Sequence, residues 1–364
     1  MTVKDVSTIL NAWAPLAYAE DFDNVGLLVG NYSQEVNNIL VAHDALENVI
    51  DEAITKKCNL IVCFHPIIFS GLKRLTASNY VECSVQKAIK NDIAIYALHT
   101  SLDNVSYGVN YGMSKALGLT KTSVLIPKEN HIYKLTTYVP KDNANKLQEA
   151  LFNAGAGNIG QYDECSFITE GTGTFKGNED SNPVVGQRGI RHSDTEMQIN
   201  ITFEKQHQSS ILKALFVNHP YEEVAYEVIK LENKLQTIGM GMIGELENEM
   251  DENDFLAFAK AIFKTGNIRH SALLNKNVKK VAVLGGSGAF SIKAAKAQGA
   301  DALITSDLKY HDYYQAENQL LLLDVGHYES ERYTKNLIAE YLNEKISTFA
   351  IILSEENTNP INYF

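Results

Sequence analysis

The sequence predicts an α/β protein whose core is a mostly parallel β-sheet, and three features support this prediction. Short apolar runs alternate with segments of helical periodicity toward both ends of the chain. Runs such as LLLL at 320–323 are apolar throughout, as expected of strands buried on both faces. The middle of the chain differs, because its first strand alternates between apolar and polar residues. We therefore expect a second type of domain there.

The first part of the chain shows the order of elements that is typical of a parallel sheet. The expected elements are a helix at 3–13, a strand at 38–42, a helix at 45–57, a strand at 59–64, a helix at 80–91, a strand at 93–98 and a helix at 108–117. Because strands joined through a helix pair in parallel, this order predicts helices on both faces of one sheet.

The middle of the chain is expected to form an inserted α+β domain. The expected elements are a strand at 131–139, a helix at 142–153 capped by Asp142, a strand at 162–169, a mobile Gly- and Asn-rich hairpin or loop, a strand at 196–203, a helix at 208–216 and a strand at 223–231. Two successive βαβ halves predict a ferredoxin-like unit. The predicted domains are therefore a core made of residues 1–128 and 234–364, interrupted by an insertion at 129–233.

The core is expected to resume with alternating strands and helices. They are a strand at 239–247, a helix at 254–263, a strand, Gly-rich turn, helix and strand within 279–305, a helix at 310–317, a strand at 320–325, a helix at 328–345 and a last strand in the tail. The turn contains Gly285, Gly286 and Gly288, and it matches neither GxxxxGK[ST] nor GxGxxG. It can either bind an anion on free N–H groups or serve as a plain tight turn.

Side chains that can bind a metal follow three of the predicted buried strands. They are His65 after the strand at 59–64, Asp103 after the strand at 93–98, and His327 with Glu331 after the strand at 320–325. The carboxyl ends of parallel strands form one rim where ligands gather. His327 and Glu331 also share one helix face, because they are four residues apart. Imidazole and carboxylate groups bind zinc, iron or manganese, so we predict a metal site formed by these four residues.

Other polar residues lie near the same predicted rim. His43 and Asp44 end the strand at 38–42, where we expect a supporting or structural role. The acidic residues near position 23 either face the metal or serve in turns and caps, and we favour the second role. His99 is expected to orient Asp103 or to hold solvent. Asp307 and Lys309 are candidate substrate contacts.

Composition excludes several classes of protein. The 364 residues carry a formal net charge of -12, which argues against broad nucleic-acid binding. No stretch is long and apolar enough to span a bilayer, and the N-terminus lacks the pattern of a signal peptide. The four cysteines show no CxxC spacing, so we expect reduced thiols in a cytoplasmic protein rather than a cysteine zinc site.

An ordered set of motifs resembles a known family. The motifs are FDNVGLLVG, FHPIIF, HTSLDN, GGSGAF, ITSDLKYH and DVGHYESE in the core, with GAGNIGQYDECSF and NHPYEEVAYEV in the insertion. Together they cover nearly the whole chain and resemble the NGG-one-interacting-factor-three-like family, whose bacterial members are usually called GTP cyclohydrolase 1 type 2 homologues. The resemblance implies a core that binds two divalent metal ions, a homo-hexamer of two stacked trimers, and an insertion similar to the PII and CutA proteins.

The resemblance also implies roles for particular residues. The family's metal ligands correspond to His65, Asp103, His327 and Glu331, and Glu331 is expected to bridge both ions. We expect zinc, with iron or manganese as alternatives. Many members have two consecutive histidines before the proline, whereas this chain has Phe64 at the first position. Phenylalanine cannot bind a metal, so one ion lacks a protein ligand and its site is expected to bind more weakly or to complete its shell with water.

Three functions are compatible with such a protein. The first is metal-dependent hydrolysis of a small-molecule substrate by a metal-bound hydroxide, either opening the guanine ring of GTP or cleaving a phosphoester or amide. The second is a non-catalytic metal-binding ring whose insertion senses or docks a partner. The third, a ring that encircles nucleic acid, is disfavoured by the acidic composition. Open coordination positions favour the enzyme, and the insertion favours the regulatory ring.

Overall fold

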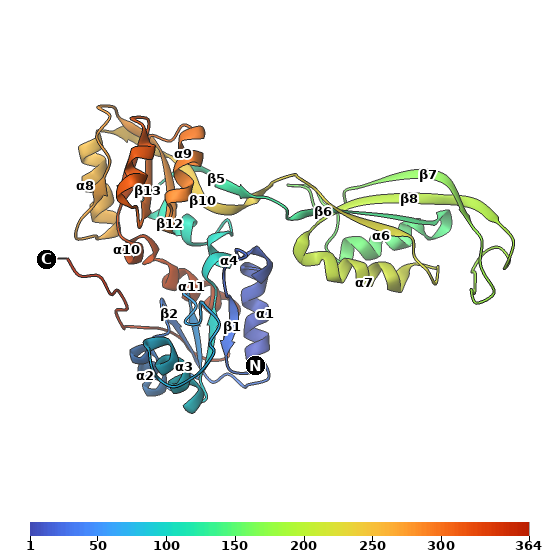
Figure 1. The fold of residues 1–364 in the computed structure, drawn as a ribbon, viewed down its shortest axis with the longest axis horizontal. Helices are drawn as coiled ribbons and strands as arrows, with labels where there is room; N and C mark the ends of the chain where they lie inside the picture. The colour runs from blue at the N-terminus through green and yellow to red at the C-terminus, as the bar shows by residue number, and fades with distance from the viewer. Residues whose placement is uncertain (364) are drawn as a thin grey trace. The chain divides into compact units, whose positions relative to one another are not determined.

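A computed structural model describes residues 1–363 of the protein and divides into two compact units (Figure 1). Unit 1 consists of Met1–Pro127 together with the chain from Gln236 onward, and unit 2 consists of Lys128–Leu235. No helix within residues 1–363 is both long and apolar enough to cross a membrane.

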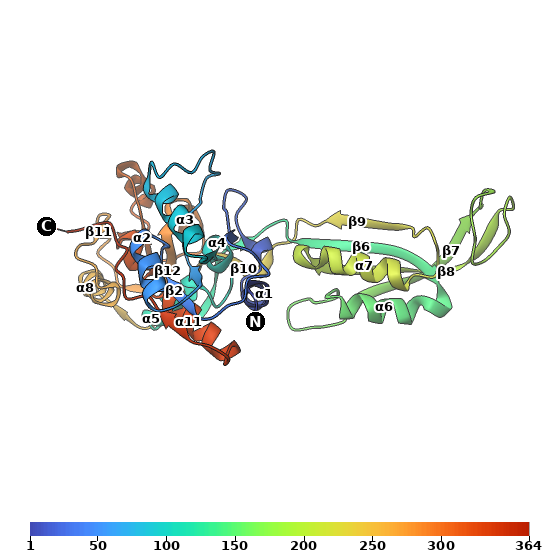
Figure 2. The ribbon, with the colours of Figure 1, turned by 90° about the horizontal axis from the view of Figure 1, so that it is seen from below.

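The first sheet of unit 1 contains five strands in the order β1-β4-β3-β2-β15. They are β1 (Gly26–Val29), β2 (Ile39–Ala42), β3 (Leu60–Cys63), β4 (Ala94–Ala97) and β15 (Ile351–Leu353). The four strands from β4 to β15 are parallel, and β1 is antiparallel to β4. Helices α2 (Glu47–Thr55) and α3 (Tyr80–Lys90) cover one face, and α1 (Val3–Trp13) and α11 (Thr334–Lys345) cover the other (Figure 2). Helices on both faces explain why β2, β3 and β4 are fully buried.

The second sheet of unit 1 contains six strands in the order β11-β14-β13-β12-β10-β5. They are β5 (Thr120–Lys128), β10 (Leu235–Met250), β11 (Arg269–His270), β12 (Val278–Ser287), β13 (Ala302–Ser306) and β14 (Leu321–Asp324). The central strands β12, β13 and β14 are parallel, whereas β10 is antiparallel to β12 and β11 is antiparallel to β14. One face packs on α5 (Val109–Ala116) and α8 (Glu252–Phe263), and the other packs on α9 (Ile292–Ala297).

The observed core is α/β, but it is not the single mostly parallel sheet that the sequence predicts. It contains two mixed sheets, each with parallel strands at its centre and an antiparallel strand on at least one side. Periodicity identifies buried strands but carries no information about which strands pair or in which direction. The candidate metal ligands therefore do not lie along the edge of one sheet. They follow strands that belong to two sheets.

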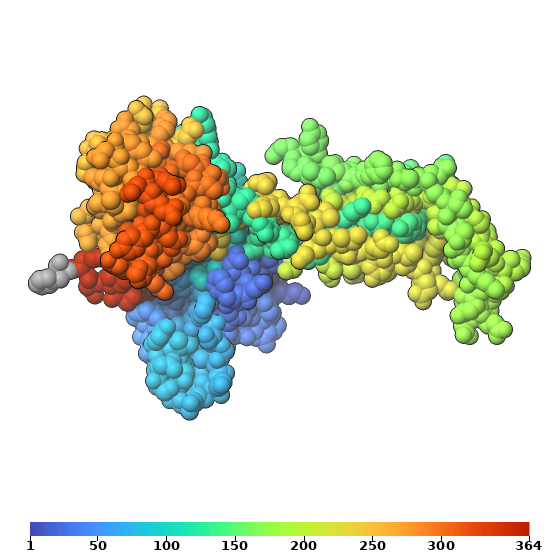
Figure 3. Space-filling view, turned by 45° about the horizontal axis from the view of Figure 1, so that its top comes forward, coloured from blue at the N-terminus to red at the C-terminus, as the bar shows by residue number. Residues whose placement is uncertain are grey.

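Unit 2 follows the element order β6, α6, β7, β8, α7, β9. These elements are β6 (Ile132–Pro140), α6 (Ala144–Asn153), β7 (Ser166–Phe175), β8 (His192–Glu204), α7 (Gln208–Asn218) and β9 (Tyr226–Lys230). The sheet order is β7-β8-β6-β9, all pairs are antiparallel, and both helices pack on one face (Figure 2). The predicted cap of α6 is wrong, because Asp142 lies in a preceding 3₁₀ turn and α6 begins after Asn143. The segment around the β7–β8 connection projects from the body of unit 2 (Figure 3).

Candidate metal centre

The candidate metal centre lies in unit 1, where strand ends of both sheets meet helix α10 (His327–Glu331). His43 follows β2, and His65 follows β3. Helix α10 follows β14, and the predicted helix at 328–345 is divided into α10 and α11. The fully buried strands fix the backbone at each of these ends, so the side chains that follow them have defined positions.

Three imidazoles converge on one carboxylate oxygen of Glu331. The Nε2 atoms of His43, His65 and His327 lie 3.4, 3.2 and 3.3 Å from Glu331 Oε2. Glu331 is 3% exposed, and its Oε2 atom has no hydrogen-bond partner among the described residues. Ligand atoms bound at about 2.0–2.1 Å to a tetrahedral zinc ion are about 3.3 Å apart. The residues present therefore fit a divalent cation in donor type and in spacing.

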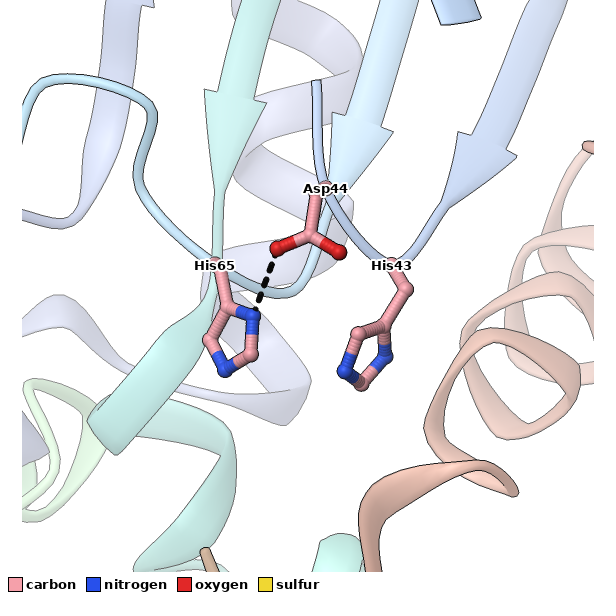
Figure 4. Close-up of side chains that lie close together, drawn as sticks. All are labelled: His43, Asp44 and His65. Carbon is pink, nitrogen blue, oxygen red and sulfur yellow. Dashed lines mark hydrogen bonds and ion pairs between the residues drawn. The ribbon is translucent and has the colours of Figure 1, made fainter. Parts of the chain in front are cut away.

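Carboxylates hold the outer nitrogen of several histidines. His65 Nδ1 lies 2.8 Å from Asp44 Oδ1 (Figure 4), and His327 Nδ1 lies 2.6 Å from Asp307 Oδ2. Such carboxylates fix the ring orientation and the tautomer of metal-binding histidines, leaving Nε2 free to bind the ion. Asp307, for which the sequence predicts a substrate contact, is thus also a partner of His327. Asp307 also adopts a left-handed backbone with φ 57°, a conformation that non-glycine residues adopt at a cost.

His99 also has a carboxylate partner, but a different one from the one expected. Its Nδ1 lies 2.8 Å from Asp23 Oδ1, and the same carboxylate accepts hydrogen bonds from Thr100. The structure therefore gives Asp23 a role in holding His99. The turn and capping role that the sequence favoured is also present, because this carboxylate accepts from the backbone N–H groups of Asn24 and of Thr100, in the first turn of α4 (His99–Asp103). The expected contact between His99 and Asp103 is not among the hydrogen bonds of the described residues.

Asp103 is buried beside this group without belonging to its tightest part. Its Oδ1 atom is buried and has no hydrogen-bond partner among the described residues. Burial, followed by the nearby charge of Glu331, raises the pKa of Asp103 well above its usual value. Two buried carboxylates with unpartnered oxygens are a costly arrangement unless a cation neutralises them.

The electrostatics of the group favour positive charge. Burial alone would lower the pKa of His65, but its interactions with Asp44 and Glu331 outweigh burial and raise this pKa to about 10. Asp307 and Glu331 likewise outweigh burial and raise the pKa of His327 to about 11. For Glu331, burial opposes ionisation, but the three histidines hold the pKa of its carboxyl well below the usual value. A field that stabilises imidazolium ions also stabilises a metal cation in the same space.

The structure brings together part of the predicted ligand set. Among the described residues, two groups have ligand atoms within 4.8 Å of one another, namely His65 with His327 and Glu331, and His65 with His43 and Asp44. Asp103 belongs to neither group. His43, to which the sequence gave only a supporting role, is as close to Glu331 as His327 is, within 0.1 Å. The sequence feature that could have identified His43 as a candidate ligand is its position directly after a buried strand, which resembles that of His65.

The Gly-rich turn makes room for the Glu331 carboxylate. Gly286 has φ 70°, and a Cβ atom there would lie 2.4 Å from Glu331 Oε1. The backbone N–H of Gly285 donates to Asn110 Oδ1, and that of Gly286 donates to Ser330 Oγ. Because these N–H groups are used, the structure favours a packing role for the turn over binding of an anion.

Comparison with known proteins places the chain in a family. The sequence profile of the family described as Duf34/NIF3 (NGG1p interacting factor 3) matches residues 1–360. The chain belongs to the Duf34/NIF3 family. A Bacillus subtilis relative called GTP cyclohydrolase 1 type 2 homolog is 37% identical over 366 residues, covering 99% of this chain and 98% of that protein.

Solved structures also resemble the chain. A Bacillus cereus protein related to NIF3 is 36% identical with a TM-score of 0.84, covering 100% of this chain and 99% of that one. A Staphylococcus aureus protein is 32% identical with a TM-score of 0.79, again covering 100% of this chain and 99% of its own. The similarity therefore extends over the whole length of both chains.

This member of the Duf34/NIF3 family has Phe64 next to its candidate ligands. Phe64 is fully buried, and its ring centroid lies 5.6 Å from that of His43 and 4.9 Å from that of His65. A cavity of about 760 Å³ adjoins the group, and its lining includes His43, His65, His327 and Tyr328. A molecule in this cavity would contact the candidate metal ligands directly.

Proposed function

We propose that the protein is a metal-dependent hydrolase of a small-molecule substrate, with chemistry like that implied by the name GTP cyclohydrolase 1 type 2 homolog. One observation carries the proposal: three imidazoles converge on a buried Glu331 oxygen that accepts no hydrogen bond from the described residues, beside a cavity of about 760 Å³. The residues that would hold two divalent ions are His65, Asp103, His327 and Glu331, with Glu331 shared between them. Zinc fits these donors best, and iron or manganese accept the same ones.

The residues of the chain have separable tasks in this proposal. Bound ions would supply Lewis acidity and lower the pKa of a water molecule. Asp44 and Asp307 keep His65 and His327 in the orientation that presents Nε2. Glu331 provides the negative charge that faces the three imidazoles. The lining residues of the cavity orient the substrate.

The cavity lining gives information about the substrate class. Its described residues include Tyr80, Tyr328 and Ile361, and none of them is a lysine or arginine. Planar side chains suit a planar heterocycle, whereas a triphosphate is usually bound by cationic side chains or metal ions. We therefore propose that hydrolysis occurs at a C–N bond of a ring or amide, and that any phosphate groups of a substrate contact the ions.

The experiment is a measurement of metal content followed by a turnover screen. Purified protein would be assayed with GTP, simple phosphoesters and cyclic amides, with and without a chelator. The hydrolase proposal expects bound metal and turnover that is lost with chelator and in Glu331→Gln. Bound metal without turnover on any of these substrates would contradict it.

A second candidate function is a metal-binding ring that docks a partner through unit 2. The observation in its favour is the apolar surface around the β7–β8 connection, where Val184 and Ile190 are 61% and 60% exposed. A cavity of about 620 Å³ adjoins this connection, with Phe175 and Tyr221 in its lining. Bound metal with no turnover would favour this function.

The assembly, fold and location of the chain belong to the same proposal. We propose that the chain forms a homo-hexamer of two stacked trimers in the cytoplasm. We also propose that unit 2 is a ferredoxin-like, PII-like insertion, which its order β6-α6-β7-β8-α7-β9 supports. Sedimentation velocity would test the hexamer.

A further inference from the structure

His43 is a buried histidine whose ring nitrogens have no hydrogen-bond partner within the described chain. It is 5% exposed, and both Nδ1 and Nε2 are buried. Buried polar groups nearly always have a partner, so an unpartnered imidazole needs an explanation. Its Nε2 atom lies 3.4 Å from Glu331 Oε2, which also has no hydrogen-bond partner among the described residues. These two atoms thus face each other without a hydrogen bond, at a separation that suits two ligands of one ion.

The position of the His43 ring is fixed by its surroundings. The carbonyl of His43 accepts hydrogen bonds from the backbone N–H groups of Phe64 and His65, at 3.2 and 3.0 Å. Its ring packs edge to face against His65 and Tyr328, with centroids 4.7 and 5.1 Å away. His43 and His65 project from neighbouring strand ends into the same space (Figure 4). A ring held by backbone and by aromatic neighbours is preorganised to bind a ligand.

We propose that His43 is a metal ligand, binding through Nε2 to the ion that lacks a ligand at Phe64. This inference rests on the proposed metal centre. Phe64 directly precedes His65 and has no donor atom. Its ring centroid lies 5.6 Å from that of His43. The His43 imidazole, at the end of β2, therefore supplies the donor that Phe64 cannot. Glu331 remains the shared ligand, because His43, His65 and His327 all approach its Oε2 atom.

The structure offers a specific rescue experiment. The variants are His43→Leu, the double variant His43→Leu with Phe64→His, and the control His219→Asn, which changes a buried histidine of unit 2 that contacts the Tyr138 carbonyl. Each would be stripped, loaded with Zn²⁺ or Co²⁺, dialysed and measured for metal per chain and for the Co²⁺ visible spectrum. We expect His43→Leu to lose one ion per chain, the double variant to regain it, and the control to match the wild type.

The result that overturns the proposal is an unchanged metal content and Co²⁺ spectrum in His43→Leu. If that variant does not fold, X-ray absorption of the zinc-loaded wild type decides instead. Three imidazoles per chain at the zinc support the proposal, and two contradict it. Failure of the underlying metal centre is distinguishable, because the wild type itself would then bind no metal.

Discussion

The carboxylates behind the histidines provide a sharp test of the candidate centre. Asp44, Asp307 and Asp23 each lie within 2.8 Å of a histidine Nδ1, but only the first two hold imidazoles whose Nε2 faces Glu331. We predict that Asp44→Asn and Asp307→Asn weaken metal binding, whereas Asp23→Asn leaves it unchanged. The three substitutions are chemically identical, so they form a matched set.

The expected magnitude follows from the hydrogen bond that each variant alters. Asparagine can still accept from Nδ1–H but loses the charge. A hydrogen bond to a charged group contributes about 1.5–3 kcal/mol, against about 0.5–1.5 kcal/mol for a neutral one. The difference of about 1–1.5 kcal/mol corresponds to about a tenfold weaker affinity. This agrees with the lower end of the range for partners of metal-binding histidines, about 10–100-fold.

The assay is competition for Zn²⁺ with a chromophoric chelator, using protein whose fold is checked by circular dichroism. Asp44 also accepts a hydrogen bond from Thr358, so Thr358→Val serves as a control for loss of that contact. An equal loss of affinity in Asp23→Asn and Asp44→Asn would refute the assignment of His65 and His327 as the carboxylate-supported ligands. Unchanged affinity in both Asp44→Asn and Asp307→Asn would refute it as well.

Three further predictions concern the Glu331 carboxylate, the Gly-rich turn beside it and the Glu82 carboxylate. Glu331→Ala should remove both ions while His327→Ala only reduces bound metal, and unchanged metal content in Glu331→Ala by elemental analysis would exclude its bridging role. Gly286→Ala should cost about 1–2 kcal/mol of unfolding free energy in denaturant titrations, because a left-handed backbone disfavours alanine. Gly286→Ala should also lower the metal content, because the added Cβ displaces Glu331. An unchanged denaturation midpoint would argue against the first effect, and an unchanged metal content against the second. Backbone and side-chain hydrogen bonds from Ser78 and Thr76 lower the pKa of Glu82 to about 2, from 4.5. The pKa of Glu82 is lower in the folded than in the unfolded state, so the ionised carboxylate stabilises the fold fully above pH 4.5, and this stabilisation is lost as the pH falls toward 2. Glu82→Gln should therefore make the free energy of unfolding depend less on pH in this range.

The sequence contained enough information to locate the buried strands and the residues at their ends. His65, His327 and Glu331 follow apolar runs, and the structure brings them together. The two sheets could not be distinguished, because runs such as 59–64 and 320–323 are both largely apolar although they belong to different sheets. Which strands pair depends on contacts between distant parts of the chain, and these leave no local pattern.

The carboxylate partners were missed for the same reason. Asp44, Asp307 and Asp23 are 21, 20 and 76 residues away from the histidines they hold. An aspartate at a strand end has many local roles, and turns and caps are the commonest of them. Only the fold shows that these three side chains point at imidazole nitrogens. The sequence assigns His43 only a supporting role, because a single histidine beside an aspartate is weak evidence for a metal ligand without its neighbours in space.

The position of the centre between two sheets links metal binding to the stability of unit 1. His43 and His65 extend from the first sheet, whereas His327 and Glu331 belong to the helix that follows a strand of the second. An ion bound by both pairs would connect the sheets and neutralise the buried Glu331 and Asp103 carboxylates. A ligand that binds only the folded state at a thousand times its Kd adds about 4 kcal/mol. Removing the metal should therefore weaken the contact between the sheets first, while unit 2, which contributes none of these ligands, keeps its own stability.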